Sequence, residues 1–294
     1  MLSAFRYSKV AKNIIRVNSF MGITNEYFYL VLGTHRAALI DSGYGIGDLR
    51  KFVSAVTDRP CIVLNTHGHP DHVGGNCLFD EVHLHPDDQG LLELYSAKEV
   101  ESMVENLLCE KKIWFDHHER LTTDTVMPEI IPLHDGEIFD LGGVTLETIA
   151  MPGHSPGSVS FLYKEEKILF SGDNCGPQPL LAIPEQCSNA GRKYSSLPLE
   201  TFFKSLIRIN ERKAEIQQIF NCHKSGELPI SCFEGVLEAV EGVLLGKYRG
   251  VPTSIFQGKV KNVFSARGLD PELVGITEES FCGDVIFAKD NLWE

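Results

Sequence analysis

The chain of 294 residues contains 43% hydrophobic and 23% charged residues, a composition typical of a globular enzyme with a large core. Its formal net charge of -13 disfavours nucleic acid as a partner, because a polyanion would meet overall repulsion. The sequence contains neither an apolar run of 18 residues nor a signal-peptide pattern near its start. We therefore expect a soluble cytoplasmic protein without a membrane partner.

The first part of the sequence predicts a meander of antiparallel strands. Short runs rich in β-branched and aromatic residues alternate with turns at residues 14–20, 26–33 and 37–43. Apolar residues at helical spacing over 45–58 then predict an amphipathic helix. The continuous apolar run over 60–66 predicts a buried strand that leads into a loop.

A charged segment of helical period at about 86–121 predicts a helical insertion. Strands, a helix, a further strand and a further helix are then predicted over residues 129–173, 195–212, 215–222 and 231–248. A C-terminal extension at about 247–294 returns to short strands and turns. The second half therefore repeats the plan of the first, and we expect one domain over 1–294.

The loop after the buried strand carries an unusual density of metal-binding side chains. Residues 65–76 read NTHGHPDHVGGN, which places His67, His69, Asp71 and His72 within six positions. A buried cluster of this kind is costly unless something satisfies its polar groups, and a metal ion would do so. Three further donors stand where a predicted strand runs into a loop: His154, Asp173 and His223.

Seven donors exceed what one catalytic ion uses, because a catalytic zinc commonly takes three protein ligands and keeps one position for water. The donors fit two ions. The predicted ligands are His67, His69 and His154 for the first ion, Asp71, His72 and His223 for the second, and Asp173 as a bridge. Imidazole and carboxylate ligands without thiolate suit zinc, and they also accept iron or manganese.

The motif THGHPDH, with IDSG before it and PGHSPGS, SGDN and NCH after it, resembles the five motifs of the metallo-β-lactamase superfamily. The resemblance spans residues 41–223. It implies an α/β fold, a four-layer αββα sandwich with the metals at one edge. It also implies that Asp41 orients a metal ligand and that zinc is the first choice of metal.

Two divalent ions would lower the pKa of a bridging water, and the resulting hydroxide would attack a carbonyl. We therefore expect a dinuclear metal-dependent hydrolase of small thioesters, lactones or esters, in which Asp71 carries a proton to the leaving group. The resemblance makes true β-lactamases and flavodiiron proteins unsuitable matches, since Asp173 and His69 depart from their respective patterns. A phosphodiesterase of the ribonuclease Z type and an iron-dependent persulfide dioxygenase-like enzyme remain as alternatives, and a scaffold without activity is disfavoured by the intact ligand set.

Residues that choose the substrate are harder to identify. Arg192, Lys193 and Tyr194 lie where related thioesterases and lactonases place a residue that contacts the substrate, although solvated residues at a helix start are the simpler explanation. The helical insertion and the C-terminal extension could roof the pocket. We expect a small-molecule substrate, and a homo-oligomer is compatible with the sequence.

Overall fold

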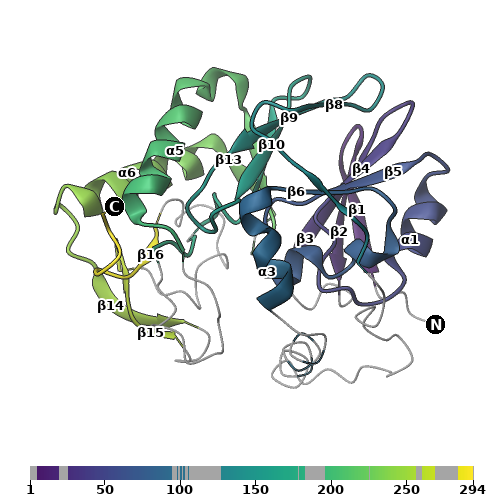
Figure 1. Cartoon of the computed structure of the whole chain (residues 1–294). Coiled ribbons are helices and arrows are strands. Elements are labelled where there is room, and N and C mark those ends of the chain that lie inside the picture. Colours follow the sequence, from purple (N-terminus) through teal and green to yellow (C-terminus); the bar gives the residue numbers. More distant parts are fainter. Residues whose placement is uncertain are drawn as a thin grey trace. The chain divides into compact units, whose positions relative to one another are not determined.

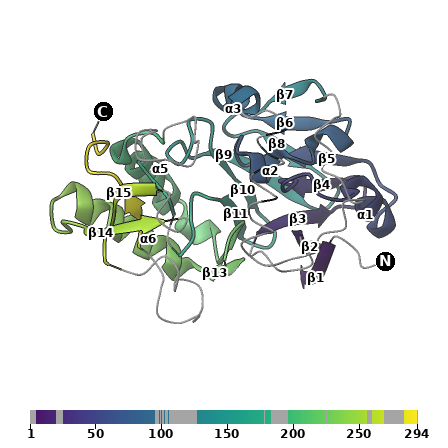
Figure 2. The same cartoon turned by 90° about the horizontal axis from the view of Figure 1, so that it is seen from below.

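The computed structural model describes residues 5–19, 26–94, 98, 100, 102, 105, 127–177, 179–182, 196–224, 226–255, 260–268 and 284–293. The chain forms two compact units, Met1–Glu147 and Thr148–Glu294, whose elements are labelled in Figures 1 and 2. The expected single domain over 1–294 stays a prediction. Within the described ranges, every helix is too short or too polar to cross a membrane.

The first unit is built on a seven-stranded sheet in sequence order. Its strands are β1 (Phe5–Ala11), β2 (Ile14–Ser19), β3 (Tyr27–Leu32), β4 (Ala37–Ile40), β5 (Cys61–Leu64), β6 (Val82–Leu84) and β7 (Ile130–Pro132). The first four strands pair antiparallel, which confirms the predicted meander, and the pairs from β4 to β7 are parallel. Strand β1 adds a pairing that the sequence pattern did not predict.

Helices of the first unit make the crossovers between its parallel strands. They are α1 (Leu49–Val56), α2 (Pro70–Val73) and α3 (Gln89–Leu94), with short 3-10 turns η2 (Asn76–Leu78) and η3 (Pro86–Asp88). The predicted helix over 45–58 is present as α1, and Asp48 caps its start by accepting a hydrogen bond from the Lys51 amide at 2.9 Å. Leu49 and Val53 of α1 are buried in the hydrophobic cluster that covers one face of the sheet.

The second large sheet has six strands in the order β13-β12-β11-β10-β9-β8. They are β8 (Ile138–Asp140), β9 (Thr145–Ala150), β10 (Val159–Tyr163), β11 (Ile168–Gly172), β12 (Gln218–Asn221) and β13 (Glu227–Pro229). The boundary between the two compact units falls within β9. Antiparallel pairs lead again to a parallel pair, β11 with β12, so the predicted repeat of the plan is confirmed.

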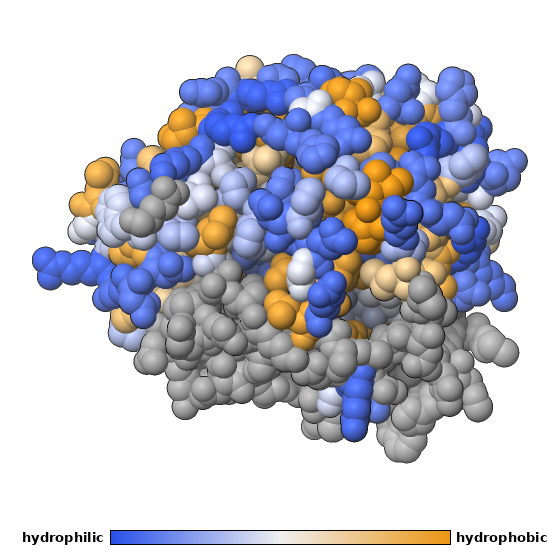
Figure 3. All heavy atoms as spheres, in the orientation of Figure 1, coloured by the Kyte–Doolittle hydropathy of each residue, from blue (hydrophilic) through white to orange (hydrophobic). Residues whose placement is uncertain are grey.

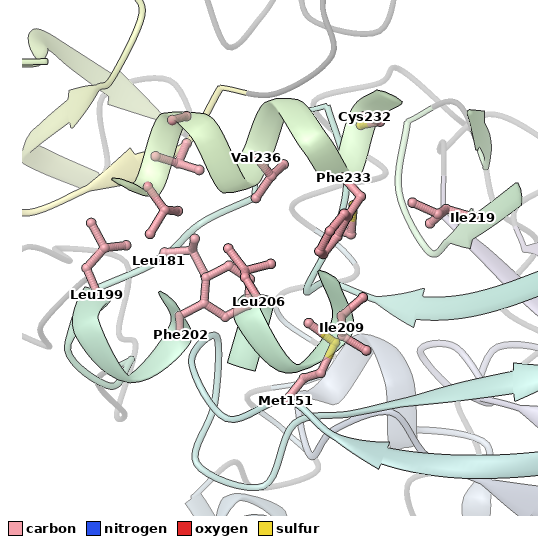
Figure 4. Packing of buried hydrophobic residues seen from close by; sticks show 14 of the residues in the cluster. Met151, Leu181, Leu199, Phe202, Leu206, Ile209, Ile219, Cys232, Phe233 and Val236 are labelled. Carbon is pink, nitrogen blue, oxygen red and sulfur yellow. The ribbon is translucent and has the colours of Figure 1, made fainter. Parts of the chain in front are cut away.

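The helices α5 (Leu199–Glu211) and α6 (Ile230–Leu244) pack against each other in the second unit, and the short turn η6 (Lys213–Glu215) follows α5. Figure 4 shows Phe202 and Leu206 of α5 lying close to Phe233 and Val236 of α6. These side chains form one buried cluster with Leu169 of β11 and other residues of the sheet. The core of the second unit therefore fixes β11 and β12, the strands that precede Asp173 and His223.

The C-terminal part forms a small antiparallel sheet of β14 (Val251–Ile255), β15 (Val260–Ser265) and β16 (Ile286–Phe287), as predicted for an extension of short strands. The predicted insertion over 86–121 begins with η3 and α3, and most of its remainder lies outside the described residues.

On the face drawn in Figure 3, hydrophilic residues predominate and hydrophobic ones are interspersed among them.

Candidate metal centre

The predicted donors all follow the carboxyl ends of strands. The first four come after β5, His154 follows β9, Asp173 follows β11, and His223 follows β12. Strands β11 and β12 are parallel neighbours, so their carboxyl ends meet at the same edge of the sheet. The structure brings the donors together in two groups, one within each compact unit.

The first group consists of the histidines and the aspartate that follow β5: His67 and His69 precede α2, and Asp71 and His72 lie in α2 and not in the predicted loop. Nε2 of His67 lies 2.9 Å from Nδ1 of His69, and Nε2 of His72 lies 3.4 Å from Oδ2 of Asp71. The three imidazoles are at most 4% exposed. The side chain of Asp71 is 19% exposed, so it combines contact with a buried ligand and access to solvent.

Hydrogen bonds to Asp41 fix the orientation of His72. The Asp41 carboxylate accepts from the Thr66 amide at 2.8 Å and from the Thr66 hydroxyl at 2.7 Å, and its Oδ2 lies 2.9 Å from Nδ1 of His72. Since a carboxylate only accepts, Nδ1 of His72 carries the proton and Nε2 presents its lone pair. This contact is the one that the predicted role of Asp41 requires.

The same hydroxyl orients His67. Its single proton is given to Asp41, so the Thr66 oxygen accepts from Nδ1 of His67 at 3.1 Å, and Nε2 of His67 keeps a lone pair. Asp41 and Thr66 are neighbours because each follows one of the parallel strands β4 and β5. Asp41 has φ of 61°, a left-handed conformation that is uncommon outside glycine and that the three hydrogen bonds hold in place.

A buried polar network beneath α2 was missed by the sequence reasoning. The Ser42 hydroxyl donates to Oδ1 of Asn76 at 2.7 Å, and Nδ2 of Asn65 donates to the His72 carbonyl at 3.0 Å. Nδ2 of Asn76 donates in turn to Oδ1 of Asn65 at 2.8 Å. The available signal was the polar residues that border the apolar run of β5, which are costly to bury without partners.

Asp88 is a second supporting residue that the sequence did not reveal. Its side chain is fully buried, and Oδ2 accepts a hydrogen bond from the Gly68 amide at 2.9 Å. A Cβ atom at Gly68 would lie 2.8 Å from the Asp88 carbonyl oxygen, so only glycine allows this close approach. Asp88 therefore holds the backbone between His67 and His69.

The second group centres on the carboxylate of Asp173. Oδ2 of Asp173 lies 3.4 Å from Nε2 of His154, and Oδ1 lies 3.2 Å from Nε2 of His223. Nδ1 of His154 donates to the Leu180 carbonyl at 2.8 Å, so its Nε2 presents a lone pair. Each oxygen of one carboxylate thus faces a different imidazole nitrogen.

These donor sets fit a divalent cation. Zinc–nitrogen bonds of about 2.0–2.1 Å in tetrahedral geometry put neighbouring ligand atoms about 3.3 Å apart. Three nitrogen–oxygen contacts in the two groups measure 3.2–3.4 Å. In His72 and His154, Nδ1 already donates a hydrogen bond, so the lone pair of Nε2 faces a carboxylate oxygen. A cation between the nitrogen and the oxygen stabilises this arrangement. The described histidines and aspartates are therefore able to hold a metal ion.

A lysine follows His223 directly. Burial lowers the pKa of the Lys224 ammonium to about 8, and the Asp284 carboxylate partly offsets this effect. Lys224 also has a positive φ, of 61°.

The predicted substrate residues Arg192, Lys193 and Tyr194 lie outside the described residues.

Curated proteins with named activities are similar in sequence to about half of this chain. The human protein named acyl-coenzyme A thioesterase MBLAC2 is 30% identical over 169 residues, which are 49% of this chain and 56% of that protein. Hydroxyacylglutathione hydrolase GloC from Haemophilus influenzae is 29% identical over 140 residues, or 47% of this chain and 60% of GloC. The chain thus spans little more than half the length of these curated relatives.

Solved structures show the same fold. A metallo-β-lactamase family protein from Thermus thermophilus matches 85% of this chain and 87% of its own, with a TM-score of 0.56 at 22% identity. The metallo-β-lactamase superfamily model matches residues 22–198, more than half of the chain. The predicted fold class is confirmed, and the chain belongs to the metallo-β-lactamase superfamily.

Proposed function

We propose that the chain is a hydrolase in which seven side chains hold two divalent metal ions, most readily zinc. The ligands would be His67, His69, Asp71, His72, His154, Asp173 and His223. The observation that carries this proposal is Asp173, whose two oxygens face two different imidazoles at 3.4 and 3.2 Å. A carboxylate in this position suits a bridge between neighbouring cations.

Divalent cations bound there supply Lewis-acid chemistry that polarises a carbonyl group and acidifies a water molecule. The protein's part is to keep the ligand nitrogens unprotonated and in place. Asp41 does this for His72, and the Leu180 carbonyl does it for His154. Because these bonds hold the proton on Nδ1, the ligand atoms need no rearrangement when a cation binds.

Asp71 is the residue that we assign to proton transfer. Its carboxylate is partly exposed and touches a buried ligand, so it can reach both an attacking water molecule and a leaving group. The Asp71 carboxylate would take a proton from the water as the carbonyl is attacked. It would then return that proton to the departing sulfur, which leaves as a thiol while the acyl group becomes a carboxylic acid.

We propose a thioester as the substrate class. Relatives with similar sequences are named acyl-coenzyme A thioesterase, hydroxyacylglutathione hydrolase and, in Aspergillus terreus, atrochrysone carboxyl ACP thioesterase. The net charge of -13 supports this choice over an RNA or DNA substrate, since binding of a phosphate backbone requires clustered lysine and arginine.

The experiment is a substrate panel on one metal-reconstituted preparation at matched salt: an acyl-coenzyme A, an acylglutathione, a lactone, a bis-aryl phosphodiester and RNA. We expect thioester hydrolysis to exceed the other activities and to disappear in His69→Ala. A matched control is His85→Ala, since His85 lies outside the predicted ligand set and its side chain is 21% exposed. Phosphodiester or RNA cleavage well above the thioester activity, abolished by His69→Ala, would overturn the proposal.

A further inference from the structure

A surface pocket of about 640 Å³ lies where α6 ends and β14 begins, at the end of β15 in the second unit. Its charged and aromatic walls are Glu238, Lys247, Tyr248, Arg249 and Arg267. Three cationic side chains thus face one carboxylate in a chain whose net charge is -13. The local charge is opposite to that of the protein as a whole.

Hydrogen bonds and packing fix the walls of this pocket. Nη2 of Arg267 lies 2.9 Å from Oε2 of Glu238, and the Tyr248 hydroxyl donates to Oε1 of Glu238 at 3.0 Å. The Tyr248 ring packs on α6 at Gly242, where a Cβ atom would lie 2.3 Å from the ring. The Arg267 amide donates to Oδ1 of Asp284 at 2.8 Å. The wall formed by Glu238, Tyr248 and Arg267 is therefore held in place before any ligand binds.

Among the described residues that line the pocket, the cations outnumber the single carboxylate. Glu238 pairs with Arg267 and lies 3.5 Å from Nζ of Lys247. Within the described part of the chain, the side chain of Arg249 has neither an ion pair nor a hydrogen bond. Three positive charges against one negative charge leave an excess that matches a phosphate dianion, and guanidinium groups suit phosphate oxygens because their donors lie in one plane.

Hydrogen bonds join the pocket to the segment that follows Asp173. The Asp284 carboxylate accepts from the Arg267 amide at 2.8 Å and from the Ser265 hydroxyl at 2.5 Å, and the Asp284 amide donates to the Pro177 carbonyl at 3.3 Å. The pocket and a predicted metal ligand are therefore tied together within the second unit, so a long substrate with its thioester near Asp173 finds partners for both ends in this unit.

We propose that this pocket binds a phosphate group carried by the thiol portion of the substrate, as in a coenzyme A thioester. The inference rests on the proposed thioester hydrolysis and adds the part of the protein that recognises the coenzyme A portion of the substrate. Acylated thiols without phosphate would lack this contact. Phosphate binding here also accounts for the cations that Glu238 leaves unbalanced.

The kinetic test compares an acyl-coenzyme A with the same acyl group on pantetheine, which has no phosphate. In Arg249→Gln/Lys247→Gln, the KM for the acyl-coenzyme A should rise about tenfold relative to the KM for the acyl-pantetheine, because two charge-assisted contacts are lost. Lys213→Gln is the matched control, since Lys213 is an exposed cation paired with Glu234 of α6 at 3.5 Å and lies outside the pocket lining. An unaltered KM ratio in the double variant would overturn the proposal.

Calorimetric titration of unacylated coenzyme A into the full-length protein separates this inference from the proposed function, because it needs no turnover. We expect at least tenfold weaker binding in the double variant than in wild type and in Lys213→Gln. That result would support the pocket even if every thioester in the panel were left intact. Equal binding by all three proteins would overturn the pocket. If inorganic phosphate bound as tightly as coenzyme A, the assignment of the pocket to coenzyme A would be overturned.

Discussion

Asp41→Asn offers a test of how the protein prepares His72 for a cation. Asparagine has the size of aspartate and tolerates the left-handed conformation, with φ of 61°, better than other non-glycine residues, so the backbone should be unaffected. The amide can still accept from the Thr66 amide. Its NH2 group replaces the oxygen that faces Nδ1 of His72 at 2.9 Å.

The consequence is a change of tautomer. Next to an amide donor, His72 is favoured with a lone pair on Nδ1 and the proton on Nε2, the nitrogen that faces Asp71. A protonated Nε2 cannot bind a metal ion, so affinity should fall about 10- to 100-fold, or roughly 1.4–2.8 kcal/mol. The loss of charge-assisted hydrogen bonds should lower the free energy of unfolding of the metal-free chain by about 1–3 kcal/mol.

Metal affinity is measured by competition with a chelating dye, and stability by urea denaturation of the metal-free protein. Asp48→Asn is the matched control, because Asp48 caps α1 at an exposed position and asparagine caps a helix about as well. The control should match wild type in both measurements. Wild-type metal affinity in Asp41→Asn would refute the argument that Asp41 sets the tautomer of His72.

Three further substitutions or modifications test the supporting structure. Asp88→Ala should weaken metal binding in the same dye assay because it frees the Gly68 amide, whereas the neighbouring exposed Asp87→Ala should not; equal effects of the two would contradict the positioning role. Phe202→Ala should lower the free energy of unfolding by about 3–5 kcal/mol, and Phe203→Ala, at a partly buried site, by clearly less; similar losses would disagree with the packing of α5. Burial raises the pKa of the Cys61 thiol to about 12, so iodoacetamide at about pH 9 should modify Cys61 slowly in the folded chain and quickly in urea, as read by mass spectrometry. Rapid labelling of the folded chain would contradict the raised pKa of Cys61. Because the unfolded thiol ionises near about 8.5, the same shift should lower the free energy of unfolding as pH rises above about 8.5.

The strands and helices that the sequence predicted are those with a clear hydrophobic period. Helix α1 and strand β5 are examples, because burial of one face or of the whole run leaves a direct pattern in the residues. Strand β1 was missed since most of its side chains are exposed and it depends on pairing with β2. Its formation follows from tertiary structure and not from local composition.

The sequence could point to candidate donors because each follows a strand and belongs to a residue type with few other reasons to cluster, and their role as metal ligands stays a prediction. The sequence could not point to their supports. Asp88 and Asn65 act through contacts with residues that only the fold brings near, such as Gly68 and the His72 carbonyl. In the sequence, Asp88 is indistinguishable from an ordinary residue at a helix start. Only the structure shows that it is fully buried and accepts a hydrogen bond from the Gly68 amide.

The central claim is that the seven donors hold two metal ions. Its most direct test is elemental analysis by plasma mass spectrometry of the full-length protein, purified without chelator and then reconstituted with excess zinc and desalted. The account predicts close to two equivalents per chain in wild type, and close to one or fewer in Asp173→Ala, which lacks the proposed bridge. Saturation of the wild-type protein at one equivalent, with the same value in Asp173→Ala, would contradict it.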